Sequence, residues 1–478
     1  MVAPFGYAAR DVLLLPDGKI LVAGGHLCPG GGCGFTLARF HAGGEPDDAF
    51  GSKGGVLTPM LGVVGISAVV RQSDGKLVAA GDASGQDQWV LARYNEHGML
   101  DSGFGSGGVT VTERAVNASF AGDVIVTAGG KLVAAGMLDG NFAIARYNAD
   151  GSLDGSFGDG GKVVTAVGSS SSSAHAVIEL PDGKLLAAGG AMGPGLFGDT
   201  SHDALLRYNA DGSLDESFGS HGKVIGLAGY ANALVRQPDG KLVTAGSRVA
   251  RYNAEGSVDV GFAPEPTPPW IVHDVLLQPD GKLVVVGVWR TIRSTSWVVR
   301  RFEPNGAPDA SFCVPPIFPR GEAYAAALQS DGKLLVSGES PVFGAGYMLA
   351  RYLGDGSGPC ADLIAPVAKL RIPRQRLGRV LTRGFAVTVG SSEPGKATLR
   401  LILTPSEARR VGITRRTTVG RGSHSFARGG RTKVRIHLTR AAKKRLGQAL
   451  RVTVSVRLAV ADRSANTVRL ARRLTLRR

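Results

Sequence analysis

Loops rich in Asn, Asp and Ser are the segments of this 478-residue chain that most resemble a metal site. The segment NADGSLD occurs at 148–154 and at 209–215, with Asn, Asp and Asp spaced by two and four residues. This spacing resembles the start of a calcium loop, but the other acidic ligands and the closing Glu of an EF-hand are missing. Asn and Asp before Gly are also typical of a plain turn. We therefore expect a structural turn, no metal site and no cofactor, with calcium as the less favoured alternative.

Motifs for nucleophilic or phosphate chemistry are missing from the sequence. There is no Gly-x-Ser-x-Gly elbow, no set of His and Cys with zinc spacing, and no phosphate-binding Gly loop. An enzyme would need a carboxylate pair or a His–Asp cluster, for which Asp11, His273 and Asp274 are the nearest candidates. We predict no catalytic residues and favour a non-enzymatic protein. The alternative is an extracellular enzyme that acts on a glycan.

Four cysteines could form two disulfides. Cys28 and Cys33 bracket Pro-Gly-Gly-Gly, a turn that can let two thiols meet, and Cys313 and Cys360 close the sixth and seventh copies of an internal repeat. An even number of cysteines with suitable partners favours disulfides in an oxidising compartment. Half a metal site at the first pair is the weaker interpretation, because no second pair or His lies at a usual spacing.

The elements that position these residues come from the internal repeat. A turn motif of the form PDGK or SDGK occurs six times and once in the degenerate form AGGK, and a Gly follows its Lys by five residues in every copy. In a second motif, ARYNADGSLDxSFG, the Arg recurs seven times and a Phe follows it by eleven residues in the first six copies. We expect these arginines to pair with a carboxylate or carbonyl of the scaffold. They are Arg39, Arg93, Arg146, Arg207, Arg251, Arg301 and Arg351.

Each repeat, of about 52 residues, is typical of four short strands (Gly18 and Gly332 are 314 residues apart over six steps). Asp-Gly between two apolar runs predicts a hairpin, because Gly adopts the positive φ of a tight turn. Four-stranded units repeated about an axis form a β-propeller. We predict an all-β fold with a seven-bladed β-propeller over residues 1–362. The seventh copy lacks a fourth strand, and we expect residues 1–7 to supply it.

The segments YNADGSLDxSFGxxGKV and LQPDGKxLVAG resemble the bacterial delta-sixty repeat over about residues 1–360. The resemblance implies a propeller-type repeat in a secreted or cell-surface protein that acts through interactions, and it implies no catalytic residues. An extracellular or cell-surface location is therefore expected, although the sequence as given has no signal peptide. No apolar run approaches the roughly 20 residues that span a bilayer. We expect a monomer without a membrane span.

Seven aligned positions at the start of the first strands are candidates for a ligand site. They lie seven residues before the turn Asp, or before its equivalent Gly129, and around a sevenfold axis they would form a ring at the channel mouth. Six are polar, although a solvated strand start would also favour polar residues. If the ring binds a ligand, its histidines can change charge near neutral pH. The ring comprises Arg10, Ser67, Gly122, His175, Asn232, His273 and Tyr324, of which we predict Arg10, His175, Asn232, His273 and Tyr324 as ligand-binding.

All four tryptophans fall in or beside connections whose lengths vary from repeat to repeat. Insertions confined to one face of a repeat protein mark its binding face. The tryptophans are therefore further candidates for contact with a carbohydrate or protein ligand, and the alternative is that they only cover the ends of the core. They are Trp89, Trp270, Trp289 and Trp297.

Charge divides the chain near residue 362. Residues 1–362 hold 26 Lys and Arg against 36 Asp and Glu, a net charge of −10, whereas residues 363–478 hold 29 against 3, a net charge of +26. Period-two alternation in residues 363–478 predicts strands, and a small basic β-sandwich similar to bacterial Ig-like modules fits best. The segments TPSEARRVG and LTRAAKKRLGQAL should form short helices, the second between Thr439 as N-cap and Gly447.

A basic tail is attracted to polyanions. Phe385 and Phe426 are the only aromatic residues in this region, so stacking on nucleic acid bases has little support. We favour attachment to an anionic envelope polymer over nucleic acid. The sequence as a whole predicts a non-enzymatic secreted or cell-surface protein for recognition or adhesion, which binds through the variable face of the propeller.

Overall fold

The computed structural model divides the chain into two compact units, Val2–Cys360 and Ala361–Arg478. The predicted boundary after residue 362 falls in a segment outside the described residues. The structure describes residues 2–3, 8–25, 34–59, 63–83, 88–112, 119–193, 200–262, 270–290, 295–309, 311–312, 321–339, 347–352, 368–373, 375–391, 395–413, 418–426, 430–462 and 467–478.

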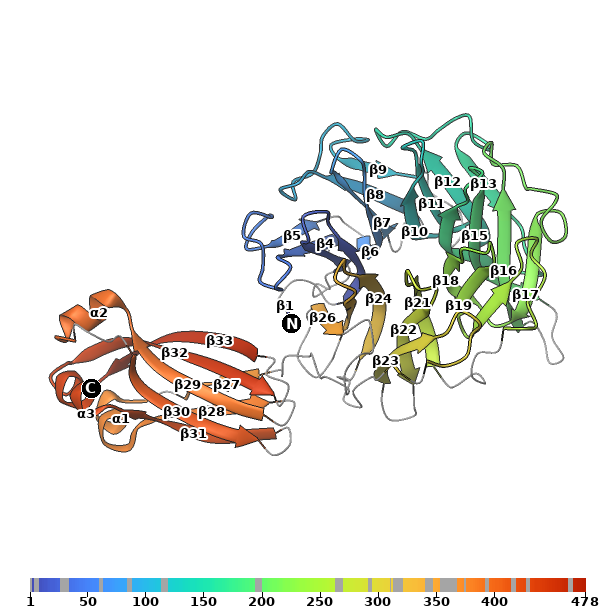
Figure 1. Ribbon diagram of the computed structural model, residues 1–478. Helices are drawn as coiled ribbons and strands as arrows, with labels where there is room; N and C mark the ends of the chain where they lie inside the picture. Colours follow the sequence, from blue (N-terminus) through green and yellow to red (C-terminus); the bar gives the residue numbers. More distant parts are fainter. Residues whose placement is uncertain are drawn as a thin grey trace. The chain divides into compact units, whose positions relative to one another are not determined.

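Seven antiparallel sheets of the first unit are arranged around a central axis as the blades of a propeller, which confirms the predicted all-β, seven-bladed fold (Figure 1). Blades 1 to 4 each contain four described strands. They are β2 (Ala8–Leu14), β3 (Ile20–Gly25), β4 (Gly34–Phe40) and β5 (Gly55–Pro59) in blade 1, β6 (Val63–Arg71), β7 (Leu77–Ala83), β8 (Gln88–Tyr94) and β9 (Val109–Val111) in blade 2, β10 (Phe120–Val126), β11 (Leu132–Leu138), β12 (Asn141–Tyr147) and β13 (Lys162–Thr165) in blade 3, and β14 (Ser172–Glu179), β15 (Leu185–Gly193), β16 (Thr200–Tyr208) and β17 (Lys223–Ala228) in blade 4.

Blades 5 and 6 each contain three described strands, and the segments that follow Phe262 and Phe312 lie outside the described residues. The strands are β18 (Ala231–Arg236), β19 (Leu242–Gly246) and β20 (Val249–Tyr252) in blade 5, β21 (Trp270–Leu277), β22 (Leu283–Arg290) and β23 (Thr295–Phe302) in blade 6, and β24 (Glu322–Leu328), β25 (Leu334–Glu339) and β26 (Tyr347–Tyr352) in blade 7.

The two ends of the repeat array meet in blade 7. There β1 (Val2–Ala3) pairs antiparallel with β26, with Val2 opposite Met348 and Ala3 opposite Tyr347. The N-terminal segment therefore supplies the outer strand of the last blade, as predicted. The hydroxyl of Tyr347 donates a hydrogen bond of 2.9 Å to the carbonyl oxygen of Thr36, and this bond joins blade 7 to blade 1.

The repeated Arg is a scaffold residue that joins neighbouring blades. In blades 1 to 6 its Nε forms an ion pair with the Oδ2 of an Asp eight residues later, and its guanidinium carbon lies 4.4–4.8 Å from the ring centroid of the repeated Phe. A terminal guanidinium nitrogen also reaches a turn carbonyl of the next blade, as between Arg146 and Ala210, and Arg351 closes the circle by reaching Ala42. The Nε–Oδ2 pairs are Arg39–Asp47 (2.7 Å), Arg93–Asp101 (2.8 Å), Arg146–Asp154 (2.8 Å), Arg207–Asp215 (2.6 Å), Arg251–Asp259 (2.8 Å) and Arg301–Asp309 (2.7 Å).

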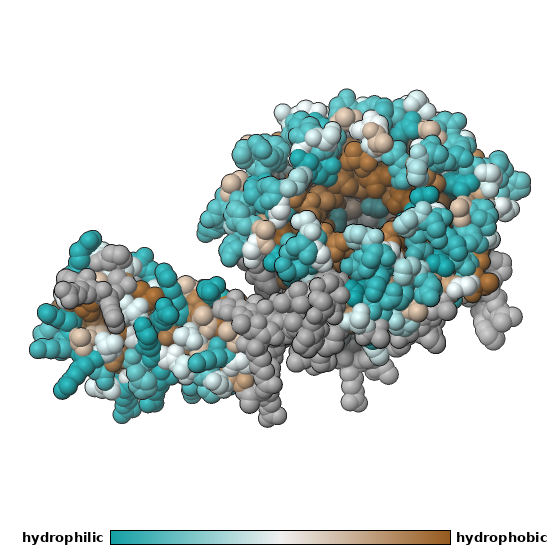
Figure 2. Space-filling model, viewed as in Figure 1, coloured by the Kyte–Doolittle hydropathy of each residue, from teal (hydrophilic) through white to brown (hydrophobic). Residues whose placement is uncertain are grey.

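Apolar side chains fill the space between successive blades. Between blades 1 and 2, for example, Phe35 and Leu37 of β4 pack with Val69 of β6 and Val90 of β8, and all four side chains are buried. Burial of such side chains provides the main free energy that holds the blades together. Figure 2 shows hydrophobic residues on the wall of the central hollow of the propeller and hydrophilic residues around it.

The second unit is a single seven-stranded antiparallel sheet in the order β27-β28-β31-β30-β29-β32-β33. Its terminal strands β27 and β33 lie side by side, so the sheet nearly closes into a barrel (Figure 1). We expected a sandwich of two separate sheets, but β30 and β31 pair at Gly420–Leu438 and Arg421–His437 and join the two halves. The Ig-like relationship therefore stays a prediction. The strands are β27 (Ala368–Arg371), β28 (Phe385–Ser391), β29 (Gly395–Leu403), β30 (Thr418–Phe426), β31 (Gly430–Leu438), β32 (Arg451–Asp462) and β33 (Thr467–Arg477).

Three short helices accompany this sheet: α1 (Leu377–Arg383), α2 (Pro405–Arg410) and α3 (Arg440–Leu446). The hydroxyl of Thr439 accepts a hydrogen bond from the backbone N–H of Ala442, and Gly447 follows the last helical turn, so the predicted cap and stop of α3 are confirmed. Thr404 caps α2 in the same way through the N–H of Glu407. The helix α1 was not predicted from the sequence.

Candidate functional site

Each inner strand of the propeller carries a β-bulge at the same place. The pairing of the first strand with the second shifts by one residue there, for example between Ala174 and Ala176 in blade 4. A bulge leaves one extra residue outside the ladder and re-aims its side chain. The extra residues are Arg10, Ser67, Gly122, His175, Asn232, His273 and Tyr324, which are the seven residues of the predicted ring.

A glycine in the second strand accommodates every bulge. A Cβ at Gly189 would lie 1.9 Å from the carbonyl oxygen of Ser173, and the Gly at the same place in the other blades meets an inner-strand carbonyl at 1.9–2.2 Å. Since no side chain fits there, a larger residue would displace the bulged strand. The Gly five residues after each turn Lys is therefore the sequence signal that could have identified the bulges, which we did not predict.

The seven bulged residues line one cavity of about 630 Å³, which we call the ring pocket. Gly25 and Asp82, at or near the ends of two second strands, also line it. These strand ends lead into the connections of variable length, so the ring pocket opens on the face where the repeats differ most. The structure thus brings Arg10, His175, Asn232, His273 and Tyr324 together, as the sequence analysis expected.

Polar groups are concentrated at the side of the ring pocket formed by blades 6, 7 and 1. Glu322 Oε2 lies 3.4 Å from His273 Nε2 and 3.4 Å from the hydroxyl of Tyr324, and Glu322 Oε1 lies 2.8 Å from Arg290 Nη2. The imidazole of His273 beside it and the charge of Arg290 lower the pKa of Glu322. The guanidinium of Arg10 lies over the ring of Tyr324, 4.2 Å from its centroid.

A second carboxyl group lies beside Glu322, and its pKa is shifted in the opposite direction. Glu339 is directly opposite Glu322 in the β24–β25 ladder. Burial, together with repulsion from Glu322, raises the pKa of Glu339. Burial also raises the pKa of Asp82, which the charge of Arg10 partly opposes. Two adjacent carboxyl groups whose proton affinities differ therefore lie next to His273 and Tyr324, which line this side of the ring pocket.

The opposite side of the ring pocket is less polar. His175 Nε2 lies 3.0 Å from Ser173 Oγ, and its ring centroid lies 5.4 Å from that of Phe120. Burial lowers the pKa of His175 to about 4, so this side chain is neutral at neutral pH and our expectation that it changes charge there is wrong. The Asn232 amide donates a 2.7 Å hydrogen bond to the carbonyl oxygen of Val272 in the next blade.

Three aspartates follow bulged residues and tie blades together. The Oδ2 atoms of Asp11, Asp123 and Asp274 accept backbone N–H groups of the next blade at 2.7, 2.9 and 2.8 Å. Burial raises the pKa of Asp123 to about 7 and of Asp274 to about 6, and repulsion between the aspartates adds to both shifts. Asp11 and Asp274, which the sequence suggested as the nearest catalytic candidates, thus contribute to the joins between blades through these bonds.

Three of the four tryptophans belong to the core. Trp89, Trp270 and Trp297 are buried, and the indole N–H groups of Trp89 and Trp297 donate to the carbonyl oxygens of Met137 and Glu339 in the next blades. We therefore withdraw these three from the ligand-binding candidates, because their rings pack between blades. Trp289 is 41% exposed and stays a candidate.

The loops with calcium-like spacing act as turns in the described structure. The carboxylate of Asp150 accepts hydrogen bonds from the backbone and hydroxyl of Ser152, and the carboxylate of Asp154 is bound by Arg146, Lys131 and Ser156. No group of three or more His, Cys, Asp or Glu side chains in the described part of the chain could hold a metal ion. The predicted disulfide cysteines Cys28, Cys33, Cys313 and Cys360 lie outside the described residues.

Comparison with known families agrees with this architecture. Six segments match the family described as domain of unknown function (DUF5122) beta-propeller, at residues 15–50, 72–104, 130–157, 180–218, 237–262 and 278–312. The chain is a propeller-repeat protein. The more specific delta-sixty name stays a prediction, and no curated protein matches the chain. Among the described residues, no helix is long and apolar enough to cross a membrane.

Solved structures similar to this chain include three with propeller or extracellular titles. The WD40 beta propeller domain of Doa1 is 14% identical with a TM-score of 0.46, and the match covers 74% of this chain and 95% of that one. Chaetomium thermophilum Sqt1 bound to the N-terminus of the ribosomal protein L10 is 9% identical with a TM-score of 0.41, covering 74% and 86%. The extracellular domain of the hybrid two component system BT3049 from B. thetaiotaomicron is 10% identical with a TM-score of 0.36, covering 98% and 67%.

Proposed function

We propose that the protein is a non-enzymatic binding module of the cell surface or extracellular space, in which the ring pocket recognises a polar ligand, a carbohydrate or a segment of protein. The basic second unit attaches to an anionic envelope polymer. The protein acts as a monomer and uses neither a cofactor nor a metal.

One contrast carries this proposal. The contacts that build the blades repeat almost without change: the same Arg, Asp and Phe recur in six blades with nearly equal distances. The bulged residues instead are a cation, a hydroxyl, a glycine, two histidines, an amide and a phenol. A scaffold needs the same group in every blade, whereas recognition of an asymmetric ligand needs different groups around the pocket.

The test is binding of the full chain to an immobilised panel of neutral and uronic-acid oligosaccharides. Arg10→Gln and Tyr324→Phe should each weaken retention by about tenfold, because each removes a polar contact from the ring pocket. Arg71→Gln, on the exposed end of β6, changes the charge by the same amount as Arg10→Gln and should leave retention unchanged. Equal retention by all three variants, each shown to be folded by its unfolding midpoint, would exclude the ring pocket as the binding site.

The adjacent Glu322 and Glu339 support the second candidate, an enzyme that acts on a glycan. Glycoside hydrolysis uses one carboxylate and one protonated carboxyl group, and the pKa values of these two side chains are shifted in opposite directions. The same oligosaccharides should then release reducing ends. Glu339→Gln would abolish this turnover while retention persists, whereas the binding-module proposal predicts no turnover in the wild type.

A further inference from the structure

Three exposed arginines form a row across three neighbouring strands of the second unit. Arg400 on β29 is directly opposite Arg421 on β30 and, on its other side, directly opposite Arg457 on β32. Neighbouring strands lie about 4.8 Å apart, so the three residues span about 10 Å of one sheet face. All three side chains are exposed. We call these residues the arginine row.

Nothing acidic balances the arginine row in the described part of the unit. Residues 363–478 contain three acidic residues, Glu393, Glu407 and Asp462, and Glu407 pairs with Arg410 at 2.7 Å. Like charges directly opposite one another in a sheet are destabilising. A bound anion would remove this repulsion, so a polyanion that reaches the arginine row stabilises the folded unit as it binds.

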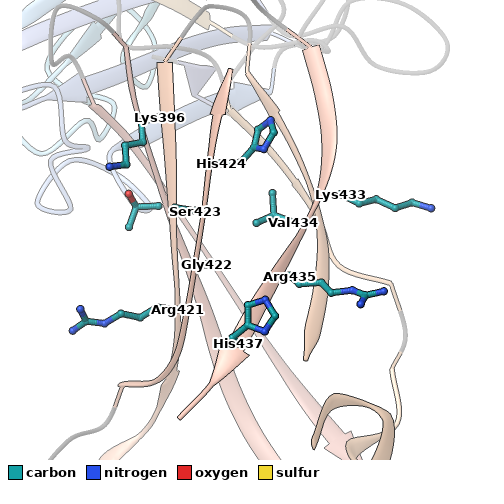
Figure 3. A pocket seen from close by; sticks show the side chains of 10 residues that line it. Lys396, Arg421, Gly422, Ser423, His424, Lys433, Val434, Arg435 and His437 are labelled. Atoms are coloured by element: carbon teal, nitrogen blue, oxygen red, sulfur yellow. The ribbon is translucent and has the colours of Figure 1, made fainter. Parts of the chain in front are cut away.

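A groove begins at the edge of the arginine row. Beside the two residue pairs that join β30 to β31, residues of β29, β30 and β31 line an open groove of about 630 Å³. Figure 3 shows Arg421 on one side of the groove, Lys433 and Arg435 on the other, and His424 and His437 between them. The groove and the arginine row share Arg421, so they form one continuous basic surface.

The shape of this surface fits a chain rather than a single anion. Exposed basic residues also recur at every second position along β31, at Arg431, Lys433 and Arg435, with about 6.8 Å between neighbours. Such regular spacing matches a polymer that carries a charge on each repeating unit. Arginine forks bind phosphate oxygens in pairs, and the hydroxyls of Thr398 and Ser423 in the groove can donate to phosphate as well.

The ligand need not carry bases. Phe385 and Phe426 are buried in the core of the unit, so neither presents a ring on which a nucleic acid base could stack. We infer that the arginine row and the adjoining groove bind a linear, base-free phosphate polymer. This inference rests on the proposed attachment of the second unit to an anionic polymer, and it assigns the residues and the chemical class.

The experiment measures binding of the full chain to fluorescent poly(glycerol phosphate) and to long-chain inorganic polyphosphate at several salt concentrations. The row variant combines Arg400→Gln, Arg421→Gln and Arg457→Gln. The control combines Arg379→Gln, Arg409→Gln and Arg440→Gln, which removes the same charge from exposed positions on the helices or, at Arg440, at the start of one. The ratio of the affinities for the two phosphate polymers identifies which of them fits the site better.

We expect the row variant to lose at least tenfold in affinity and the control less than threefold. The slope of log K against log salt should fall by about two in the row variant, as expected for the loss of three phosphate contacts to a flexible strand. Polymer should raise the unfolding temperature of the wild type and of the control but not of the row variant. Without polymer, the row variant should be at least as stable as the wild type, because its repulsion is gone.

Each negative result would overturn a different part of the proposal. Equal losses in the row and control variants would overturn the site but leave attachment through net charge intact. Tighter binding of poly(U) or of polygalacturonate than of either phosphate polymer would overturn the chemical class. No binding of any polymer to the wild type would overturn the proposed attachment itself.

Discussion

In blades 1 to 5 the repeated arginine makes three kinds of contact. It forms an ion pair with an Asp, stacks on a Phe and bonds to a carbonyl of the following blade, and its charge is largely shielded from water by these partners. The pairing was predicted from the recurrence of the residue, because a residue present in every repeat belongs to the scaffold. The hydrogen bond to the next blade was not predicted, because the sequence does not show which backbone carbonyl the arginine contacts.

Replacement of this arginine should destabilise the propeller. We expect Arg146→Ala to lower the free energy of unfolding by about 2–3 kcal/mol, because Asp154 loses its closest cation while Lys131 and Ser156 remain. Urea unfolding measures the change. Arg71→Ala, an exposed arginine of the same unit, should cost less than about 0.5 kcal/mol, and an equal effect of the two substitutions would contradict the scaffold role.

The buried aspartates behind the ring should make stability depend on pH. The folded-state pKa of Asp123, about 7, is higher than the value of about 3.9 in an unfolded chain. The folded protein therefore binds more protons between about pH 4 and 7, and the contribution of Asp123 to the free energy of unfolding falls as pH rises through this window.

Asp123→Ala tests this dependence, and alanine already occupies the position in blades 2, 4, 5 and 7. The substitution removes two hydrogen bonds and should cost about 1–2 kcal/mol at pH 5, but clearly less at pH 8, where the wild type must bury a charge. Unfolding in urea at both pH values gives the comparison. Asp182→Ala in an exposed turn is the control, and an equal cost of Asp123→Ala at pH 5 and pH 8 would show that Asp123 does not titrate in this range.

Among the local features of the strands, the hairpin turns were predicted and the bulges were not. Asp-Gly between apolar runs identifies a turn because the φ of its glycine is a local requirement, and Gly183 adopts φ of +79°. The bulge depends on the contact of an inner strand with a glycine in its partner, so period and propensity alone do not reveal it. The same limit explains the tryptophans, whose burial depends on the packing of the next blade.

Gly183→Ala isolates the backbone strain of the turn. No atom lies within 4 Å of a Cβ at this position, so the left-handed φ alone sets the cost, and we expect a loss of about 1 kcal/mol in the free energy of unfolding. Gly155→Ala is the matched control, because its surroundings are equally open and its φ is not in the left-handed region. A similar loss at Gly155 would mean that glycine flexibility, rather than turn geometry, was measured.

For the molecule as a whole, composition separates a body of repeats from a basic tail of strands, and the boundary near residue 362 stays a prediction. The closure of the ring through the N-terminal segment was also predicted, because the last repeat lacked one strand. The continuous sheet of the second unit was not predicted, because the alternation of apolar and polar residues predicts strands but leaves their order in the sheet open. The pairing of β30 with β31 depends on contacts between residues that lie far apart in the sequence.

The two units should unfold as separate cooperative structures. Leu399 is fully buried in the core of the second unit, and Leu206 is fully buried between blades 3 and 4. Each Leu→Ala substitution should cost about 2–5 kcal/mol in its own unit. Differential scanning calorimetry should show Leu399→Ala shifting one transition and Leu206→Ala the other, and a single transition shifted by both would contradict this independence.

The bulges have a consequence for how such a protein can change. A bulged residue makes no ladder contact, so its identity is nearly independent of the pairing that holds its blade together. Mutation can therefore vary seven positions around one pocket, singly or in combination, while the framework residues stay fixed. Randomising the seven bulged residues in a library of variants therefore offers a route to new binding specificities on an unchanged backbone.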